Sequence, residues 1–268
     1  MLGAIIGDIV GSRFEFNNYK DKDFELFAKG CTITDDSVMT LAIAKAIHAC
    51  EGDGDWDKLG ANAVKYMQEI GRKHPDCGFG GMFYHWIFSD DPKPYNSFGN
   101  GAAMRVSPCG FAAKTEEEAK LLSRKVTEVT HNHAEGIKGA ESVTVAIYMA
   151  RSGGTKEDIR RRIESDYYDL GFTLDEIRDT YRFDVSCQGS VPKAIVAFLE
   201  SFTFEDAIRN AVSIGGDSDT LAAIAGAIAE AHYGVPQSIK RKALTYLDDG
   251  LLGIYRAWEG LRPDIWRF

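Results

Sequence analysis

Residues 37–50 read SVMTLAIAKAIHAC, a stretch whose apolar residues lie nearly all round a helical projection. A helix that is hydrophobic on almost every side must be buried among other elements, so this stretch predicts a central helix. An amphipathic helical pattern follows over residues 56–73, and no segment alternates apolar and polar residues around a hairpin turn. We therefore expect an all-α fold that forms one domain over residues 1–268.

Capping-box patterns, in which Ser or Thr precedes an acidic residue by three positions, mark further helix starts. These patterns are Thr115/Glu118, Thr155/Asp158, Thr173/Glu176 and Thr203/Asp206. The two that end in Asp are weaker, because the box prefers Glu or Gln at its far position. Together with the apolar periodicity, they predict helices near 116–129, 134–152, 156–166, 187–201, 204–213, 219–233 and 237–248.

Glycine recurs every four residues near the start of the chain, at Gly3, Gly7 and Gly11. On a helix these positions form a smooth strip that lets a second helix approach closely. A membrane dimer face is excluded, because no apolar run approaches the ~20 residues that a membrane span requires. The strip therefore predicts tight helix packing in a soluble bundle.

The composition is that of a globular protein, with 268 residues, 44% of them hydrophobic and 26% charged. A net charge of −9 argues against non-specific binding to nucleic acid, which favours a basic surface. The five cysteines are scattered and contain no Cys-x-x-Cys pair, and the first residues lack a basic leader. These features predict a cytoplasmic protein without a membrane partner, and they leave the oligomeric state open.

Two acidic clusters each open a strongly apolar helix, namely Thr34-Asp35-Asp36-Ser37 and Gly215-Gly216-Asp217-Ser218-Asp219-Thr220. Adjacent carboxylates at the edge of a core need partners, because burying an unpaired carboxylate is costly. Hard divalent cations would satisfy them with carboxylate and hydroxyl oxygens. The alternative is that both clusters are ordinary helix caps, for which Asp, Ser and Thr are the usual residues. From the residues alone, both interpretations stand.

Glycine-rich segments precede two further helix starts, at Gly78-Phe79-Gly80-Gly81 and Gly99-Asn100-Gly101. A glycine loop that runs into a helix presents backbone N–H groups to phosphate, although such loops are more often simple turns. His131 and His133 are similarly ambiguous, since each would either contact phosphate or end the preceding helix.

Taken in order, these segments resemble the ADP-ribosylglycohydrolase family. The resemblance rests on Gly7-Asp8-x-x-Gly11-Ser12 with Glu15, on Thr34-Asp35-Asp36-Ser37, on Gly99-Asn100-Gly101-x-x-Met104-Arg105, on Thr130-His131 and on Gly215-Gly216-Asp217-x-Asp219-Thr220. It implies an all-α orthogonal helical bundle that holds two divalent cations, Mg²⁺ or Mn²⁺. The metal ligands that it implies are Thr34, Asp35, Asp36, Asp217, Asp219 and Thr220.

The resemblance also implies a reaction, which is cleavage at the anomeric carbon of the distal ribose. An ADP-ribosylated protein or a small ADP-ribose conjugate would be the substrate, and free ADP-ribose the product. Glu15 or Asp36 would act as general acid or base on a transition state like an oxocarbenium ion. The pyrophosphate would lie on the loops around Gly80, Gly99, Asn100 and Gly101, with His131 nearby.

The acceptor is less well specified, because Ser97 stands where the nitrogenase-regulating branch of the family carries Asp. That departure places arginine-linked substrates in doubt and makes O-linked ones the closer match. Two other functions stay open at this stage. One is a non-catalytic module that binds ADP-ribose, and the other is a phosphohydrolase with a binuclear metal centre.

Overall fold

The computed structural model describes residues 1–52 and 54–262. Helices make up 65% of the structure, and the described residues contain no β-strand. The nearest approach to a sheet is an isolated antiparallel bridge between Gly99 and Ser186. The prediction of an all-α fold is confirmed.

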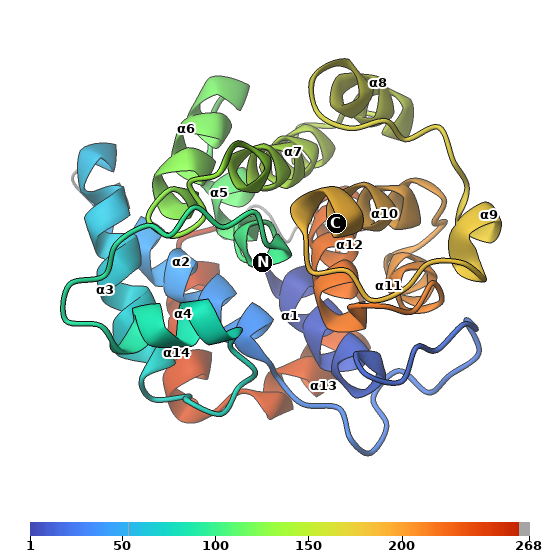
Figure 1. Cartoon of the computed structure of the whole chain (residues 1–268), viewed down its shortest axis with the longest axis horizontal. Coiled ribbons are helices and arrows are strands. Elements are labelled where there is room, and N and C mark those ends of the chain that lie inside the picture. Colours follow the sequence, from blue (N-terminus) through green and yellow to red (C-terminus); the bar gives the residue numbers. More distant parts are fainter. Residues whose placement is uncertain (53, 263–268) are drawn as a thin grey trace.

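Figure 1 shows how the helices are arranged, with the early and late parts of the chain meeting in the middle. The α-helices are α1 (Leu2–Gly11), α2 (Asp35–Glu51), α3 (Leu59–Gly71), α4 (Gly81–Phe88), α5 (Ser107–Ala112), α6 (Glu116–Thr127), α7 (Ala134–Arg151), α8 (Lys156–Asp166), α9 (Leu174–Arg178), α10 (Cys187–Leu199), α11 (Phe204–Val212), α12 (Ser218–Tyr233), α13 (Gln237–Ala243) and α14 (Asp249–Gly260). Short 3₁₀ turns are η1 (Ser12–Phe14), η2 (Trp56–Lys58), η3 (Asn100–Ala102) and η4 (Leu244–Tyr246).

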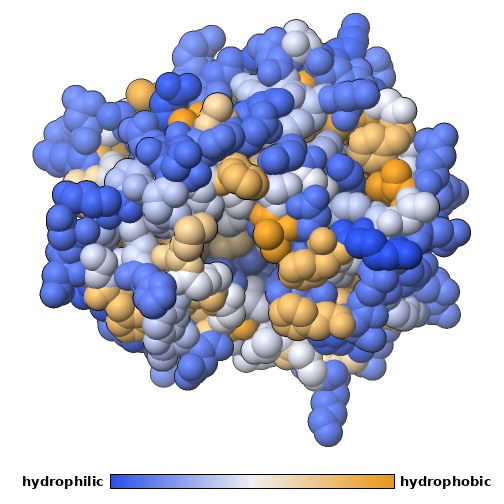
Figure 2. Space-filling view, viewed as in Figure 1, coloured by the Kyte–Doolittle hydropathy of each residue, from blue (hydrophilic) through white to orange (hydrophobic). Residues whose placement is uncertain are grey.

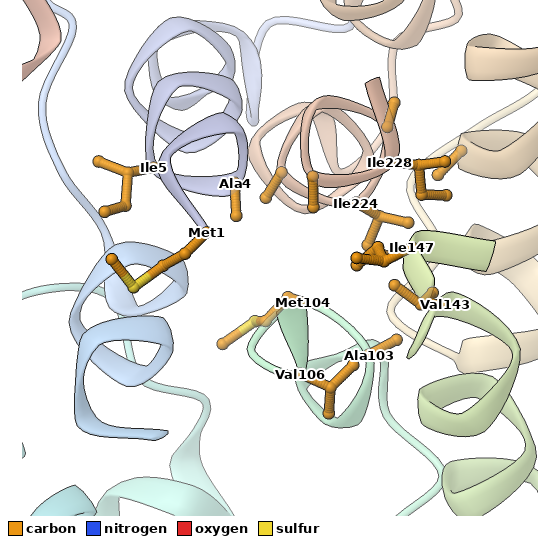
Figure 3. Close-up of a cluster of buried hydrophobic side chains, with 14 of the residues drawn as sticks. Met1, Ala4, Ile5, Ala103, Met104, Val106, Val143, Ile147, Ile224 and Ile228 are labelled. Carbon is orange, nitrogen blue, oxygen red and sulfur yellow. The ribbon is translucent and has the colours of Figure 1, made fainter. Parts of the chain in front are cut away.

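Three helices form the centre of the structure, and each is buried over most of its length. Every residue of α1 is buried, and α12 is buried from Ser218 to Glu230. The segment 37–50 forms most of α2 and packs against α1, α3, α5 and α14, as its apolar surface predicted. Figure 3 shows side chains of α1, α7, α12 and residues 103–106 converging in one apolar cluster.

The crossing of α1 and α12 is very close, and the glycine strip makes it possible. A Cβ added at Gly7 would overlap the backbone of Ala222, and one at Gly3 would overlap Gly226. At Gly11 the clash would be with Ser218 and Asp219, at the start of α12. The prediction that the strip serves tight packing in a bundle is confirmed.

Most of the predicted helices agree with the structure to within two residues at each end, but the C-terminal region differs. The helix expected over 237–248 ends at Ala243 and tightens into η4. A separate helix, α14, was not predicted; Asp248 caps it by accepting a hydrogen bond from the Leu251 N–H at 2.9 Å. The sequence pattern predicts that Asp248 ends the preceding helix, whereas in the structure it begins a new one.

The capping boxes depend on more than the identity of their acidic residue. Thr155 and Asp158 form a complete reciprocal box, so the helix start that this pattern predicts is present even with Asp at the far position. At Thr115, the Glu118 N–H still donates to the Thr hydroxyl, but the Glu118 carboxylate accepts instead from Lys114 and Trp56. A nearby competing donor therefore decides whether the second bond of a box forms.

None of the described helices is both long enough and apolar enough to span a lipid bilayer.

We predict that Gly7→Ala lowers the free energy of unfolding by about 1–3 kcal/mol, because the added methyl group would force α1 and α12 apart. Urea denaturation followed by circular dichroism measures the change. Gly253→Ala is the matched control, since Gly253 lies in α14, is exposed and has open space at its Cβ position. The control should be neutral or gain up to about 1 kcal/mol of helix propensity. Equal stability of the two variants would contradict the close crossing.

Candidate active site

The N-terminal ends of α2 and α12 open on one cavity of about 380 Å³. Figure 2 shows the surface hollowed near the centre of this face, with hydrophobic side chains gathered around the hollow. Most of the residues predicted for the site line the cavity, namely Glu15, Asp35, Asp36, Gly80, Gly99, Asn100, Gly101, His131, Asp217, Asp219 and Thr220. Thr34 lies beside it, as the N-cap of α2.

Asp8 organises the first acidic cluster, although the sequence analysis did not assign it to the site. Its carboxylate is fully buried and accepts hydrogen bonds from the Thr34 N–H at 2.9 Å and the Thr34 hydroxyl at 2.7 Å. It also accepts from the Ser37 N–H at 3.0 Å and from the Ser37 hydroxyl. A signal was available, because Asp8 is the one charged residue in an otherwise apolar helix of residues 2–11.

The second cluster sits on a tight turn that only glycine adopts easily. Gly215 and Gly216 have φ angles of +66° and +75°, in the left-handed region. The Gly216 N–H donates to the Asn18 side-chain oxygen at 3.2 Å. Lys20 donates to the carbonyl oxygens of Tyr181, at 2.9 Å, and Ile214. A loop from the start of the chain thus holds the turn that presents Asp217 and Asp219.

The two clusters meet, although more than 180 residues separate them in the sequence. The Thr220 hydroxyl donates to Asp36 Oδ2 at 3.2 Å. One carboxylate oxygen each from Glu15, Asp217 and Asp219 lie within 4.8 Å of one another. Asp35 lines the same cavity. Together with Glu15, Asp36, Asp217 and Asp219, it makes a group of five acidic side chains that face one small volume.

Ordinary helix capping does not account for these carboxylates. Thr34 already caps α2, because its hydroxyl accepts a hydrogen bond from the Asp36 N–H at 3.3 Å. Asp217 occupies the N-cap position of α12 but makes no side-chain capping bond. The acidic side chains are aimed into the cavity, which leaves them available for another partner.

Burial and mutual repulsion make this group of carboxylates hard to ionise. Burial, followed by the charge of Asp219, raises the pKa of Asp35 to about 8 and that of Glu15 to about 7. Burial also raises the pKa of Asp217 to about 6, and it raises those of Asp36 and Asp219 well above their usual range. Within residues 1–52 and 54–262, Asp36 Oδ1 is buried and accepts no hydrogen bond. A divalent cation fits such a set, because it supplies the missing positive charge to hard oxygen ligands.

Asn100 links the glycine-rich loop to the acidic group. Its side-chain amide donates to Asp217 Oδ2 at 2.6 Å and to the Ser190 hydroxyl at 3.0 Å. Its backbone N–H donates to the Val185 carbonyl at 2.7 Å. The side chain predicted to contact substrate thus uses both of its amide hydrogens to hold a carboxylate and a neighbouring helix.

The two histidines have different roles. His133 caps α7, where its Nδ1 accepts a hydrogen bond from the Glu135 N–H at 3.1 Å. His131 is buried and lines the cavity beside Gly99 and Gly101. Only His131 is therefore placed to contact a ligand, and neither histidine ends the preceding helix, which stops at Thr127.

Exposed aromatic residues at the mouth of the cavity were not predicted. Phe16 and Phe183 stack with their ring centroids 6.0 Å apart, although 85% and 48% of their surfaces are exposed. Both line the cavity next to Glu15. Single aromatic residues in loops carry no periodic signal, so nothing in the sequence marked them.

Comparisons with known proteins agree with the resemblance seen in the sequence. The sequence model of the ADP-ribosylglycohydrolase family matches residues 1–262. The chain is similar to ADP-ribosylhydrolase ARH3 of Homo sapiens, with 27% identity over 94% of this chain and 90% of that protein. It is also similar to ADP-ribosylarginine hydrolase Tri1 of Pseudomonas putida (strain GB-1), with 27% identity over 88% of this chain and 70% of the other.

A solved structure described as an ADP-ribosylglycohydrolase-related protein complex shares the fold. It aligns with a TM-score of 0.65 and 20% identity, over 97% of this chain and 96% of that one. At that identity the match establishes the arrangement of helices and no more.

We predict that Asp8→Asn lowers the free energy of unfolding by about 1–3 kcal/mol, because an amide cannot accept all four of the hydrogen bonds that the carboxylate receives. Urea denaturation gives the value. Asp90→Asn is the control, since Asp90 is exposed in a loop and should tolerate the change. A stability for Asp8→Asn equal to that of the control would show that the carboxylate does not support the start of α2.

Proposed function

Because the chain belongs to the ADP-ribosylglycohydrolase family, we propose that it hydrolyses the bond between the distal ribose of ADP-ribose and an acceptor. The acceptor is a modified protein or a small molecule, and free ADP-ribose is the product. The observation that carries this proposal is the convergence of five acidic side chains, from both ends of the chain, beside two glycine-rich loops in one cavity.

We propose that two divalent cations, Mg²⁺ or Mn²⁺, are held by Thr34, Asp35 and Asp36 on one side and by Asp217, Asp219 and Thr220 on the other. The unpaired Asp36 Oδ1 supports this assignment, as does the proximity of the Glu15, Asp217 and Asp219 oxygens. The Thr34 hydroxyl gives its proton to Asp8 and accepts a hydrogen bond from the Asp36 N–H, which leaves one oxygen lone pair for a cation. Two dications would nearly cancel the charge of the five carboxylates, which is otherwise costly to bury.

The cations, when bound, would orient the ribose hydroxyls and lower the pKa of a water near the anomeric carbon. The chain itself supplies the group that moves the proton, for which the candidates are Glu15 and Asp36. Glu15 is the better placed, because it is half-buried and borders both the cavity and its mouth. Asp36 is buried, and one of its oxygens already accepts from Thr220. An anionic pocket also favours the positive charge that develops on the ribose.

The glycine-rich loops are suited to the pyrophosphate of ADP-ribose. A cavity of about 380 Å³ lies within the range of small-molecule sites. A Cβ at Gly99 or Gly101 would stand 3.5 or 3.4 Å from His131 Nε2, so glycine keeps the space in front of that nitrogen open. We therefore place the anionic part of the ligand along Gly80, Gly99 and Gly101, facing His131, with Asn100 holding Asp217 in register.

The acceptor side of the cavity is the mouth, where Phe16 and Phe183 flank Glu15. Ser97 lines the cavity and accepts a hydrogen bond from the Gly99 N–H at 3.1 Å. It carries no negative charge for a guanidinium group. For this reason we expect O-linked conjugates to be cleaved faster than arginine-linked ones.

We predict that the protein releases ADP-ribose from ADP-ribosylserine or O-acetyl-ADP-ribose in the presence of Mg²⁺ or Mn²⁺, and that a chelator abolishes this release. Asp35→Ala and Asp219→Ala should lose it too, because each removes a carboxylate from the shared volume. Mass spectrometry of the products is the measurement, with an ADP-ribosylarginine peptide as the comparison substrate. Asp90→Ala, an exposed loop variant, should keep full activity.

The same product analysis separates the other two functions. Binding of ADP-ribose without cleavage of any of the three conjugates would favour a binding module. Inorganic phosphate or AMP as the product would favour a phosphohydrolase. Full activity after exhaustive chelation would remove the cations from the proposal.

We predict that Mg²⁺ or Mn²⁺ raises the melting temperature of the parent protein, since a ligand that binds only the folded state stabilises it. In a chelator, Asp219→Asn should melt at or above the parent temperature, because it removes one of several buried like charges. The variant should then gain little from added cation. Differential scanning calorimetry makes the comparison, in chelator and at cation concentrations raised until the melting temperature of the parent protein increases no more than the logarithm of the concentration requires. An equal cation response in parent and variant would argue against a metal ligand at this position.

A further inference from the structure

Arg105 is a buried cation with no acidic partner in the part of the chain that the structure describes. It is 1% exposed, and no carboxylate of residues 1–52 or 54–262 lies within 4 Å of its guanidinium. Its Nη2 donates to the Thr130 hydroxyl at 2.6 Å and lies 3.5 Å from His131 Nδ1. The guanidinium also packs against the Phe83 ring, 5.4 Å from its centroid. Burying a cation is costly, so its contacts with Thr130 and His131 call for a physical reason.

The positions of the protons in this group follow from the chemistry of arginine. A guanidinium can donate hydrogen bonds but cannot accept them. Thr130 Oγ1 therefore accepts from Arg105, and its own proton is free to reach His131 Nδ1 at 2.7 Å. If the proton were on Nδ1, the His131 Nδ1–H and the Arg105 Nη2–H would be two donors facing each other at 3.5 Å. The other acceptor near the Thr130 hydroxyl, the Thr127 carbonyl, is more distant at 3.4 Å.

We propose that Arg105 and Thr130 are positioning residues that fix His131 in the tautomer with its proton on Nε2. That proton then points toward the Gly99–Gly101 loop, because Nε2 is the ring atom nearest to the Cβ positions of both glycines. The site gains one N–H donor that faces the place of an anionic ligand. The use of this donor for the pyrophosphate rests on the proposed function, whereas the tautomer itself does not.

One further observation fits this assignment. Burial, and then the charge of Arg105, lowers the pKa of His131 well below its usual range, so the ring stays neutral. A neutral ring has one donor nitrogen and one acceptor nitrogen, and the tautomer decides which of them faces the ligand. With the proton on Nδ1, the lone pair of Nε2 would face the phosphate oxygens and repel them.

The first test is the tautomer in the ligand-free protein. Long-range ¹H–¹⁵N correlation spectra of protein labelled with ¹⁵N-histidine distinguish the two neutral tautomers and the imidazolium, and His131→Gln assigns the signal. We expect the pattern of an Nε2–H tautomer in the parent and in Thr130→Ser, which keeps the hydroxyl. Thr130→Val should shift His131 toward the Nδ1–H form or a mixture.

Thr127→Val is the matched control for Thr130→Val. Thr127 is buried one turn earlier, and its hydroxyl has no hydrogen-bond partner among the described residues. Its variant should leave the His131 signals unchanged. An Nδ1–H tautomer or an imidazolium in the parent would overturn the proposal, as would a Thr130→Val spectrum identical to the parent. If Thr130→Val does not fold, the parent and Thr130→Ser spectra still decide the tautomer.

The second test is affinity for ADP-ribose, measured by isothermal titration calorimetry. Thr130→Val should weaken binding about tenfold or more, since a hydrogen bond to a charged group is lost, and Thr130→Ser should restore it. An Nε2–H tautomer in a parent that does not bind ADP-ribose would contradict the proposed function and leave the tautomer assignment intact. Unchanged affinity in Thr130→Val, with a changed tautomer, would show that the Nε2 proton does not serve the ligand.

Discussion

The close crossing of α1 and α12 is the constraint on which the rest of the site depends. The glycine strip on α1 lets the two backbones touch, and Gly11 brings the end of α1 against Ser218 and Asp219. A further side chain of the same helix, Asp8, binds the start of α2 through Thr34 and Ser37. One short helix thus joins two acidic clusters that lie far apart in the sequence. Any residue larger than glycine in the strip would separate them.

This arrangement gathers negative charge in a buried place, which lowers the stability of the fold when no cation is bound. Carboxylates that are buried together have raised pKa values, because both burial and repulsion oppose ionisation. Hydrogen bonds hold the segments that carry these carboxylates: Thr34 caps α2, and Asn18 and Lys20 bind the Gly215–Gly216 turn and the residue before it. A partner of opposite charge would lower this cost, and the proposed cations would be such a partner.

The wall of the cavity that carries Asn100 and His131 holds hydrogen-bond donors in fixed positions. Asn100 uses its side-chain amide to hold Asp217, so the glycine-rich loop and the acidic group keep one register. Arg105 and Thr130 act on His131 in a similar way, from a position behind the ring. Donors that are oriented before the ligand arrives lose little freedom on binding. The two walls therefore suit a ligand with a polyanionic part and a neutral sugar, which matches the proposed substrate.

Local features of the chain were readable from the sequence because their causes act over a few residues. The apolar surface of 37–50 and the glycine spacing at residues 3–11 each predicted what the structure contains. The motifs also indicated which residues would form the site, and the family confirms the class of protein. The predicted end of the helix over 237–248 was wrong, because an aspartate can either cap a new helix or continue the helix before it. Composition alone cannot separate those cases.

Only the tertiary structure decided which polar groups are partners. The contact of Thr220 with Asp36, the four bonds of Asp8 and the group of Arg105, Thr130 and His131 join positions that are distant in the sequence. The same holds for Asn100, whose side chain turned out to hold a carboxylate. A hydrogen bond needs two atoms within about 3 Å, and packing of the whole chain sets that distance. The sequence identifies the chemical groups, whereas the packing of the folded core determines which of them are close enough to interact.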